Sequence, residues 1–324
     1  MNNITVVMYH YVRDIQNSKY PNIKGLDIKS FQNQLDYLQK YYNIISPDKF
    51  IDSLENKLTL PNNSALLTFD DAYIDHFNNV FPILKKRNIF GCFFPPVKCV
   101  LQEKVLDVNK IHFILASASN VGDLIKIIFK SLDKYRSEYK LESNDFYWKK
   151  CAKANRYDNA NVKFVKNILQ RDIDEKLRGI ITDELFSEFV CDDEKLFASE
   201  LYMNHDQVLY LHNNGMYIGG HGFDHYHLDS ISSEHQKREI DLTVSFLDNI
   251  GTDINNWMMC YPYGDYNESL LDFLKLKKCL LGFTTNINIA NLNKDNLLTL
   301  PRLDTNDLPK IVDSKINSWT KKII

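Results

Sequence analysis

Short apolar segments alternate with amphipathic helical segments along this 324-residue chain, and this alternation limits its fold more than any other feature. The apolar segments have the length of buried strands, and the segments between them carry apolar residues at helical spacing. Strands that alternate with helices favour a parallel sheet, because parallel strands need a crossover connection. We therefore predict an α/β fold, and the order of elements fits both a barrel and an open sheet. The expected strands are 3–9, 65–69, 89–94, 216–220, 257–262, 282–285 and 298–304, and the expected helices are 28–41, one from 46, 75–87, 205–214, 233–249 and 267–278.

Residues 101–200 have a different character from the rest of the chain. This stretch is rich in Lys, Asp, Glu and Asn, contains no Pro, and has apolar residues at helical spacing from Leu124 to Leu132. We interpret it as a helical insertion in a core formed by residues 1–100 and 201–324. The insertion could be a lid over a binding site, or a subdomain for oligomerisation or stability. Arg156 and Tyr157 are side chains that could bind a sugar phosphate, but nothing singles them out.

The overall charge and the cysteines exclude several classes of protein. The 39 Lys and Arg against 42 Asp and Glu give a net charge of −3, so no electrostatic signal points to nucleic acid. No apolar run has the roughly 18 residues of a membrane helix. The six cysteines form no CxxC pair and are expected to be structural. The first residues lack the pattern of a secretory signal, so we expect a cytoplasmic location.

The first candidate site is the pair Asp70 and Asp71, directly after the apolar segment 65–69. In parallel sheets, ligands gather where strands end. Two adjacent carboxylates cannot point the same way, so one could bind a metal ion while the other faces a water molecule. The alternative is that both residues cap the helix that follows.

The second candidate site is His221-Gly-Phe-Asp-His225, directly after the expected strand 216–220. Two histidines at this spacing can bind one cation if the backbone is helical or tightly turned, and neutral imidazole suits Zn²⁺. No Glu lies between them, which excludes the HExxH metalloprotease motif. Two imidazoles and one carboxylate would form an open, catalytic type of metal site. The alternative is a polar loop with structural histidines.

Two further groups of residues follow later strands. The turn Tyr261-Pro262-Tyr263-Gly264 could present a backbone N–H and a flat apolar wall, or it could be an ordinary turn. The segment Pro301-Arg302-Leu303-Asp304 ends the last expected strand. An Arg and an Asp this close in sequence more often form a structural salt bridge than a catalytic pair.

Taken in order, these segments resemble the motifs of the polysaccharide deacetylase family, the NodB-homology carbohydrate esterases of family four. TFDDAYIDHFNNVFPILKKRNIFGCFF resembles the first motif, GGHGFDHYHL the second and CYPYGDYN the third. MYHYV and PRLDTND resemble flanking elements of a bacterial subgroup. The resemblance covers roughly residues 1–100 and 200–308. Each motif is short, but all of them occur in the family's order at the ends of expected strands.

The resemblance implies a fold and a set of functional residues. The fold would be a distorted, incomplete (β/α) barrel with the helical insertion, and the site would lie at its C-terminal face. The activity would be metal-dependent hydrolysis of N-acetyl groups on amino sugars, with Zn²⁺ as the expected ion. The implied metal ligands are Asp71, His221 and His225, and the implied general base is Asp70. The implied substrate-binding residues are Tyr261, Pro262, Asp304 and Tyr263, whose N–H would hold the oxyanion.

The chain departs from the family pattern at three places. Ala72 replaces the usual Gly after the paired aspartates, and WMMCYPYG lacks the Arg that orients the base. We expect Arg302 to replace that Arg. No His follows His235, so the usual late general acid is missing. We expect His10 to supply the proton, with His227 as the weaker candidate, provided His10 lies within about 8 Å of the site.

The predicted substrate is an N-acetylated amino sugar, carried on a nucleotide, a lipid or a glycan. The expected cytoplasmic location favours a precursor of a bacterial surface polysaccharide such as O-antigen or capsule. One alternative is a related amide hydrolase, such as a deformylase acting on a sugar or a non-sugar. Another is a binding protein that kept the fold without catalysis. We expect no nucleic acid partner and no transmembrane segment, and an oligomer could form through the insertion.

Overall fold

The chain forms two compact units in the computed structural model, which describes residues 3–156, 158–311 and 313–324. The first unit consists of residues 1–14, 25–103 and 199–324, and the second of residues 15–24 and 104–198. Nothing in the sequence indicated that residues 15–24 belong with the later helical segment. Tyr157, one of the two residues considered for a sugar phosphate, lies outside the described residues.

The first unit is built on parallel strands. β1 (Asn3–Tyr9) pairs with β3 (Ser64–Asp70), which pairs with β4 (Cys92–Phe94), which pairs with β5 (Tyr217–Ile218). A short β2 (Asn43–Ile44) also pairs with β3, and β9 (Leu303–Asp304) pairs with β1. β6 (Trp257–Cys260) and β7 (Cys279–Phe283) form a separate parallel pair, and β8 (Ala290–Asn291) is antiparallel to β1. The predicted α/β fold with a parallel sheet is confirmed.

Single bridges connect the two sheets. Gly220 pairs with Met259, which links the end of β5 to β6, and Phe283 pairs with Leu300, which links β7 to the segment before β9. Gly220 has to be a glycine here, because a Cβ atom would lie 2.7 Å from Thr243 and 2.8 Å from Trp257. At these two places the neighbouring strands are joined by one bridge each and not by a regular ladder of hydrogen bonds. This interrupted pairing is why the barrel is described as distorted and incomplete.

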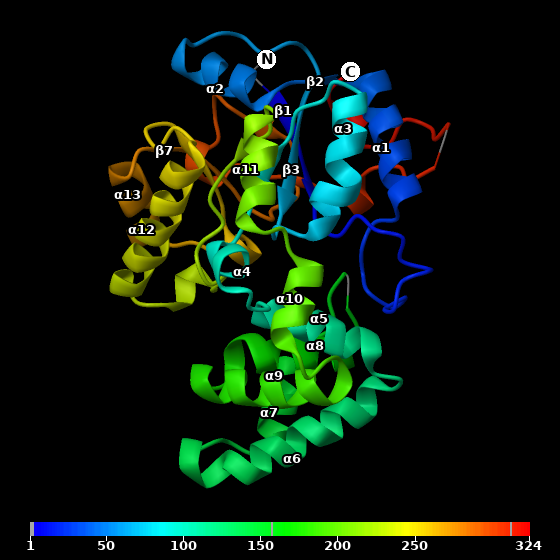
Figure 1. The fold of residues 1–324 in the computed structure, drawn as a ribbon, viewed down its shortest axis with the longest axis vertical. Coiled ribbons are helices and arrows are strands. Elements are labelled where there is room, and N and C mark those ends of the chain that lie inside the picture. The colour runs from blue at the N-terminus through cyan, green and yellow to red at the C-terminus, as the bar shows by residue number, and fades with distance from the viewer. Residues whose placement is uncertain (1–2, 157, 312) are drawn as a thin grey trace. The chain divides into compact units, whose positions relative to one another are not determined.

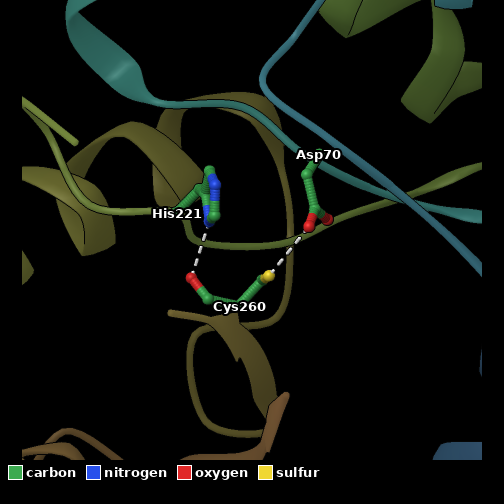
Figure 2. Close-up of side chains that lie close together, drawn as sticks. All are labelled: Asp70, His221 and Cys260. Atoms are coloured by element: carbon green, nitrogen blue, oxygen red, sulfur yellow. Dashed lines mark hydrogen bonds between the residues drawn. The ribbon is translucent and has the colours of Figure 1, made fainter. Parts of the chain in front are cut away.

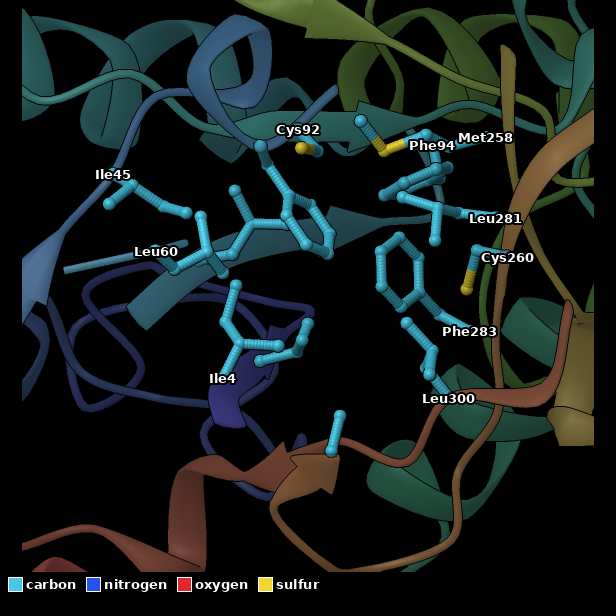
Figure 3. Close-up of a cluster of buried hydrophobic side chains, with 14 residues drawn as sticks. Ile4, Ile45, Leu60, Cys92, Phe94, Met258, Cys260, Leu281, Phe283 and Leu300 are labelled. Carbon is cyan, nitrogen blue, oxygen red and sulfur yellow. The ribbon is translucent and has the colours of Figure 1, made fainter. Parts of the chain in front are cut away.

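Buried apolar side chains fill the space enclosed by these strands. Every residue of β3 is buried, so both faces of this strand are covered, as in parallel sheets generally. Figure 3 shows the cluster, in which side chains from β1, β3, β4, β6 and β7 meet. Its members include Ile4, Leu66, Phe94, Met258 and Phe283.

Helices of the first unit surround these strands (Figure 1). Polar caps and a left-handed glycine mark the ends of two of these helices. Ser46 caps α2 (Pro47–Glu55), and the Asn204 side chain caps α11, which ends before Gly215 at a φ of +83°. The remaining helices are α1 (Ile28–Tyr41), α3 (Phe81–Lys86), α4 (Val97–Gln102), α11 (His205–Asn213), α12 (Ser233–Ile250) and α13 (Glu268–Leu276).

Several element boundaries differ from the sequence-based prediction: the strands expected at 89–94, 216–220 and 257–262 are shorter, at 92–94, 217–218 and 257–260. The helix expected at 75–87 begins with a π-helical turn, His76–Val80, before α3. The strand expected at 282–285 lies earlier, at 279–283. The single strand expected at 298–304 is a 3₁₀ turn, Leu297–Thr299, followed by β9 at 303–304. Short apolar runs carry no periodicity signal, so their ends depend on which neighbours pair with them.

The second unit is mainly helical between residues 104 and 198, whereas residues 15–24 form turns and loops. Its apolar side chains from different helices pack together, and Phe113, Ile128, Phe164, Leu177 and Ile181 are at most 1% exposed. Its helices are α5 (Asp107–Ser117), α6 (Val121–Tyr139), α7 (Asn144–Cys151), α8 (Ala160–Asn167) and α9 (Glu175–Phe189), and α10 (Glu194–Leu201) leads back to the first unit. In the part of the chain that the structure describes, no helix has both the length and the apolar character needed to cross a membrane.

Candidate active site

The carboxyl ends of the parallel strands bring most of the predicted site residues together. His10 follows β1, Asp70 ends β3, His221 follows the bridge at the end of β5, and Cys260 ends β6. Parallel strands run in the same direction, so their carboxyl ends share one edge of the sheet. The two clusters that lie about 150 residues apart in the sequence therefore meet at this edge.

Asp71, His221 and His225 form a compact group at this edge. Oδ1 of Asp71 lies 3.3 Å from Nε2 of His221 and 3.3 Å from Nε2 of His225. All three residues are buried, and their ligand atoms lie close enough together to hold one metal ion. Buried carboxylates and imidazoles in such a group need a partner that satisfies their lone pairs.

The contacts around this group fit a divalent cation. His221 donates its Nδ1–H to the carbonyl oxygen of Cys260 at 2.7 Å, so Nε2 carries the lone pair that faces Asp71. Oδ1 of Asp71 has no hydrogen-bond partner among the described residues. The spacing of 3.3 Å also equals the distance between ligands held about 2.0–2.1 Å from a tetrahedral ion. Oδ1 of Asp71 and the Nε2 atoms of His221 and His225 thus lie close together, where a cation would stabilise them.

Tight turns aim these side chains inward. Asp71 and Ala72 have φ values of +75° and +55°, and Gly222 and His225 have +74° and +59°. Left-handed backbone is unfavourable for residues other than glycine, so these turns are held by their surroundings. The two histidines therefore converge through a tight turn, one of the two backbone geometries that the spacing allowed. The positive φ of Ala72 also explains why a Gly would suit that position.

The carboxylate of Glu239 holds the loop between the two histidines. Its Oε2 accepts the backbone N–H groups of Phe223 and Asp224 at 2.8 and 2.9 Å. Glu239 is 1% exposed, and burial raises its pKa. Lys98 forms an ion pair with Asp224 on the same loop. These contacts fix the loop that presents both imidazoles.

Asp70 is held by Arg302, the residue expected to replace the missing Arg. The guanidinium contacts both carboxylate oxygens, with Nη1 at 3.0 Å from Oδ1 and Nη2 at 2.8 Å from Oδ2. Arg302 is itself fixed, because its Nε–H donates to the Thr284 carbonyl and Nη1 to the Thr68 hydroxyl. Burial by itself would raise the pKa of Asp70, but the charge of the Arg302 guanidinium opposes it, and the pKa is lowered. Asp70 is therefore ionised at neutral pH.

His10 lies beside Asp70. Its Nε2 is 3.9 Å from Oδ2 of Asp70, and its side chain is 41% exposed. This distance can be spanned by one bridging water. The buried His76 fixes the backbone of His10, since its Nε2–H donates to the His10 carbonyl at 2.9 Å. His10 combines closeness to Asp70 with access to solvent.

The rings of Tyr263 and His227 form a flat surface beside His225. Their rings stack with centroids 3.7 Å apart, and Tyr263 also meets the edge of His225 at 4.8 Å. His227 pairs through Nδ1 with Asp265 at 2.6 Å. Tyr263 has a φ of +59°, and Pro262 before it is buried. The predicted flat wall after β6 is thus present, with Tyr263 as its partly exposed member.

Two of the predicted substrate-binding side chains are engaged elsewhere. The Tyr261 side chain is fully buried, and its hydroxyl donates to the Leu298 carbonyl at 2.7 Å. The Asp304 carboxylate caps a 3₁₀ turn by accepting the Asn306 N–H at 2.8 Å. The placement of these two side chains favours a structural role for both over a role in substrate binding. The alternative of an Arg302–Asp304 salt bridge is wrong, because Arg302 pairs with Asp70.

Three residues at the site were not anticipated. Tyr73 donates its hydroxyl to Oδ2 of Asp71 at 2.8 Å, and Glu239 holds the histidine loop. Cys260, expected to be only a small apolar core residue, contacts both Asp70 and His221 (Figure 2). None of the three belongs to a recognisable spacing pattern, so only the tertiary contacts reveal them.

The comparisons with known proteins point to one family. A family model described as polysaccharide deacetylase matches residues 189–279. The matched segment contains His221, His225 and the turn after β6, whereas Asp70 and Asp71 lie outside it. The resemblance to the polysaccharide deacetylases is confirmed. The expected enzyme class, a hydrolase acting on the C–N bond of an acetylated amine, agrees with this family.

Solved structures of deacetylases share the fold. Streptococcus pyogenes deacetylase PplD in complex with acetate is 18% identical, with a TM-score of 0.58 and coverage of 93% of this chain and 92% of that one. A de-N-acetylase from Aggregatibacter actinomycetemcomitans is 16% identical, with a TM-score of 0.56 and coverage of 99% and 100%. IcaB from Ammonifex degensii is 17% identical, with a TM-score of 0.53 and coverage of 94% and 91%. No curated protein sequence matches the chain. The predicted NodB-homology type of fold is thus confirmed.

Proposed function

We propose that this chain is a metal-dependent de-N-acetylase that hydrolyses the acetamide of an N-acetylated amino sugar. The observation that carries the proposal is the pairing of two functions at one edge of the sheet. Asp71, His221 and His225 converge as ligands, and Asp70 lies next to them as a separate carboxylate held by Arg302. A cation-binding group beside an ionised base is the arrangement that amide hydrolysis requires.

Each side chain has a defined part in this chemistry. When bound by Asp71, His221 and His225, a divalent cation lowers the pKa of water and polarises the amide carbonyl. Asp70 takes the proton of the attacking water, and Arg302 keeps its carboxylate ionised and oriented. His10 gives a proton to the leaving amine, which agrees with its distance from Asp70 and its exposure. The N–H of Tyr263 stays the predicted donor to the oxyanion.

The finer features of the proposal come from the sequence. Zn²⁺ is the proposed ion, because two imidazoles and a carboxylate are a common ligand set for it. A nucleotide- or lipid-linked amino sugar used for a surface polysaccharide stays the predicted substrate, and the cytoplasm the predicted compartment. Residues 101–200 stay a predicted lid or oligomerisation element.

The test measures which small acid the protein releases. The full chain is incubated with N-acetylated amino sugars, free, nucleotide-linked and as oligosaccharides, and with N-formyl analogues. We expect acetate release from at least one N-acetyl sugar, loss of activity with a chelator, and recovery with Zn²⁺. Release of formate alone would favour the deformylase alternative. A protein that binds no divalent cation and releases neither acid would be a non-catalytic relative.

A further inference from the structure

We infer that Cys260 is a positioning residue for the reaction: its thiol orients the Asp70 carboxylate, while its carbonyl orients His221. This inference rests on the proposed function, because it assigns a part in catalysis to a residue that contacts the base. It concerns a side chain that has no role in the chemistry as proposed above. Figure 2 shows the three residues together.

The distances place Cys260 between the two functional groups. Its Sγ lies 3.3 Å from Oδ2 of Asp70, and its carbonyl oxygen lies 2.7 Å from Nδ1 of His221. An ionised carboxylate only accepts hydrogen bonds, so the thiol has to be the donor. Because one residue makes both contacts, the position of the end of β6 sets the position of Asp70 relative to His221.

The surroundings of Cys260 keep it in the role of a hydrogen-bond donor. The residue is fully buried, and its Sγ faces the Asp70 carboxylate, which can only accept a hydrogen bond. A role as metal ligand would need the thiolate and a lone pair on Nδ1 of His221. That nitrogen carries the hydrogen donated to the Cys260 carbonyl. The His221 lone pair therefore faces Asp71, and the cation group forms on that side.

The thiol holds the Asp70 carboxylate from a different side than Arg302 does. The guanidinium contacts both oxygens of Asp70, and the thiol contacts Oδ2 from β6. A carboxylate held from two strands has less freedom to rotate than one held from a single strand. Catalysis by a base depends strongly on such orientation, whereas binding of the sugar does not. Loss of the thiol should therefore lower kcat and leave KM and metal binding unchanged.

The test compares Cys260→Ala and Cys260→Ser with Cys92→Ala. Cys92 is a matched control, because it is also fully buried in the same apolar cluster (Figure 3). We expect Cys260→Ala to lower kcat about 5- to 10-fold, the worth of one hydrogen bond, with unchanged KM and metal content. Cys260→Ser keeps a donor and should recover to within about threefold of the wild type. Equal kcat in Cys260→Ala and Cys92→Ala would overturn the inference.

A spectroscopic measurement tests the contact without relying on activity. The S–H stretching band of Cys260 is identified by infrared difference between the wild type and Cys260→Ser. We expect this band to shift to higher frequency in Asp70→Ala, since the thiol then loses its charged acceptor. An unshifted band would overturn the inference, whatever the activity. A shifted band in a protein that releases no acetate would reject the proposed function and keep the contact.

Discussion

Arg302 and Asp70 form a bidentate ion pair across 232 residues of sequence, with nitrogen-to-oxygen distances of 3.0 and 2.8 Å. Arg302 is 1% exposed, so this is a buried pair whose charges depend on each other. The pair joins the last strand region of the barrel to the centre of the site. It therefore couples the integrity of the fold to the orientation of the base.

The first prediction concerns this ion pair. Arg302→Lys keeps the positive charge but loses the planar fork that contacts both oxygens, so kcat should fall about 10- to 100-fold with little change in KM. Arg302→Met leaves a buried carboxylate unpaired and should destabilise the fold by about 3–5 kcal/mol. Steady-state kinetics and chemical unfolding measure both effects. The control is Arg87→Lys, whose partner Asp36 is exposed, and an equal loss in both lysine variants would contradict the prediction.

The second prediction separates the base from the metal ligands. Asp70→Asn should retain the metal and lose at least about 100-fold in kcat, because an amide cannot accept the proton. His221→Ala should lose metal as well as activity, since it removes one of three ligands. Metal analysis of the purified proteins, together with kinetics, distinguishes the two. The assignment of the site would be wrong if both variants remained active.

The third prediction concerns the hydroxyl that orients Asp71. Tyr73→Phe removes the donor at 2.8 Å from Oδ2, and metal affinity should fall about 10- to 100-fold. Tyr9→Phe is a suitable control, because the Tyr9 hydroxyl is buried with no hydrogen-bond partner among the described residues. That control should keep its metal affinity. Competition with a chromogenic chelator measures the affinities, and equal values for the two variants would argue against the role of Tyr73.

The fourth prediction is a dependence of stability on pH that arises from His76. Burial lowers the pKa of His76 to about 4, well below its value in the unfolded chain. As the pH falls from 7 to 5, the unfolded chain takes up a proton that the folded chain excludes, so stability decreases. His76 should account for about 2 kcal/mol of this decrease.

Unfolding by denaturant at both pH values checks this contribution. In His76→Gln the loss of stability between pH 7 and pH 5 should be smaller by about 2 kcal/mol, because the titrating group is gone. His205→Gln is the control, since the His205 side chain is 40% exposed. An unchanged pH dependence in His76→Gln would show that the buried imidazole does not carry the effect.

The spacing of apolar residues and the helix caps were sufficient to predict several helices and the residues that follow the strands. Helices with clear periodicity and caps, such as α1 and α2, lie where the sequence placed them. Asp70, Asp71, His221 and His225 could be found because each follows an apolar strand, and strand ends share an edge. The limits of the strands at 279–283 and 303–304 could not be predicted from the sequence, because short strands end where their pairing partners end.

The sequence could also not show in which direction the side chains at strand ends point. The aromatic and proline pattern indicated a turn at 261–264, but it could not show that the Tyr261 side chain points into the core while Tyr263 lies near His225. Asp304 stood next to Arg302 in sequence, yet it caps a turn. Side-chain direction at the end of a strand depends on the twist and pairing of its neighbours.

By itself, the sequence determined the alternation of strands and helices, the ligand types, and their positions after strands, because these depend on residues near one another in the chain. Only the tertiary structure decided which groups touch. It placed Arg302 and Cys260 on Asp70, and Tyr73 on Asp71, through contacts between segments brought together by sheet pairing and local turns. These contacts depend on packing at distances of 3–4 Å, for which a single sequence carries no periodic signal.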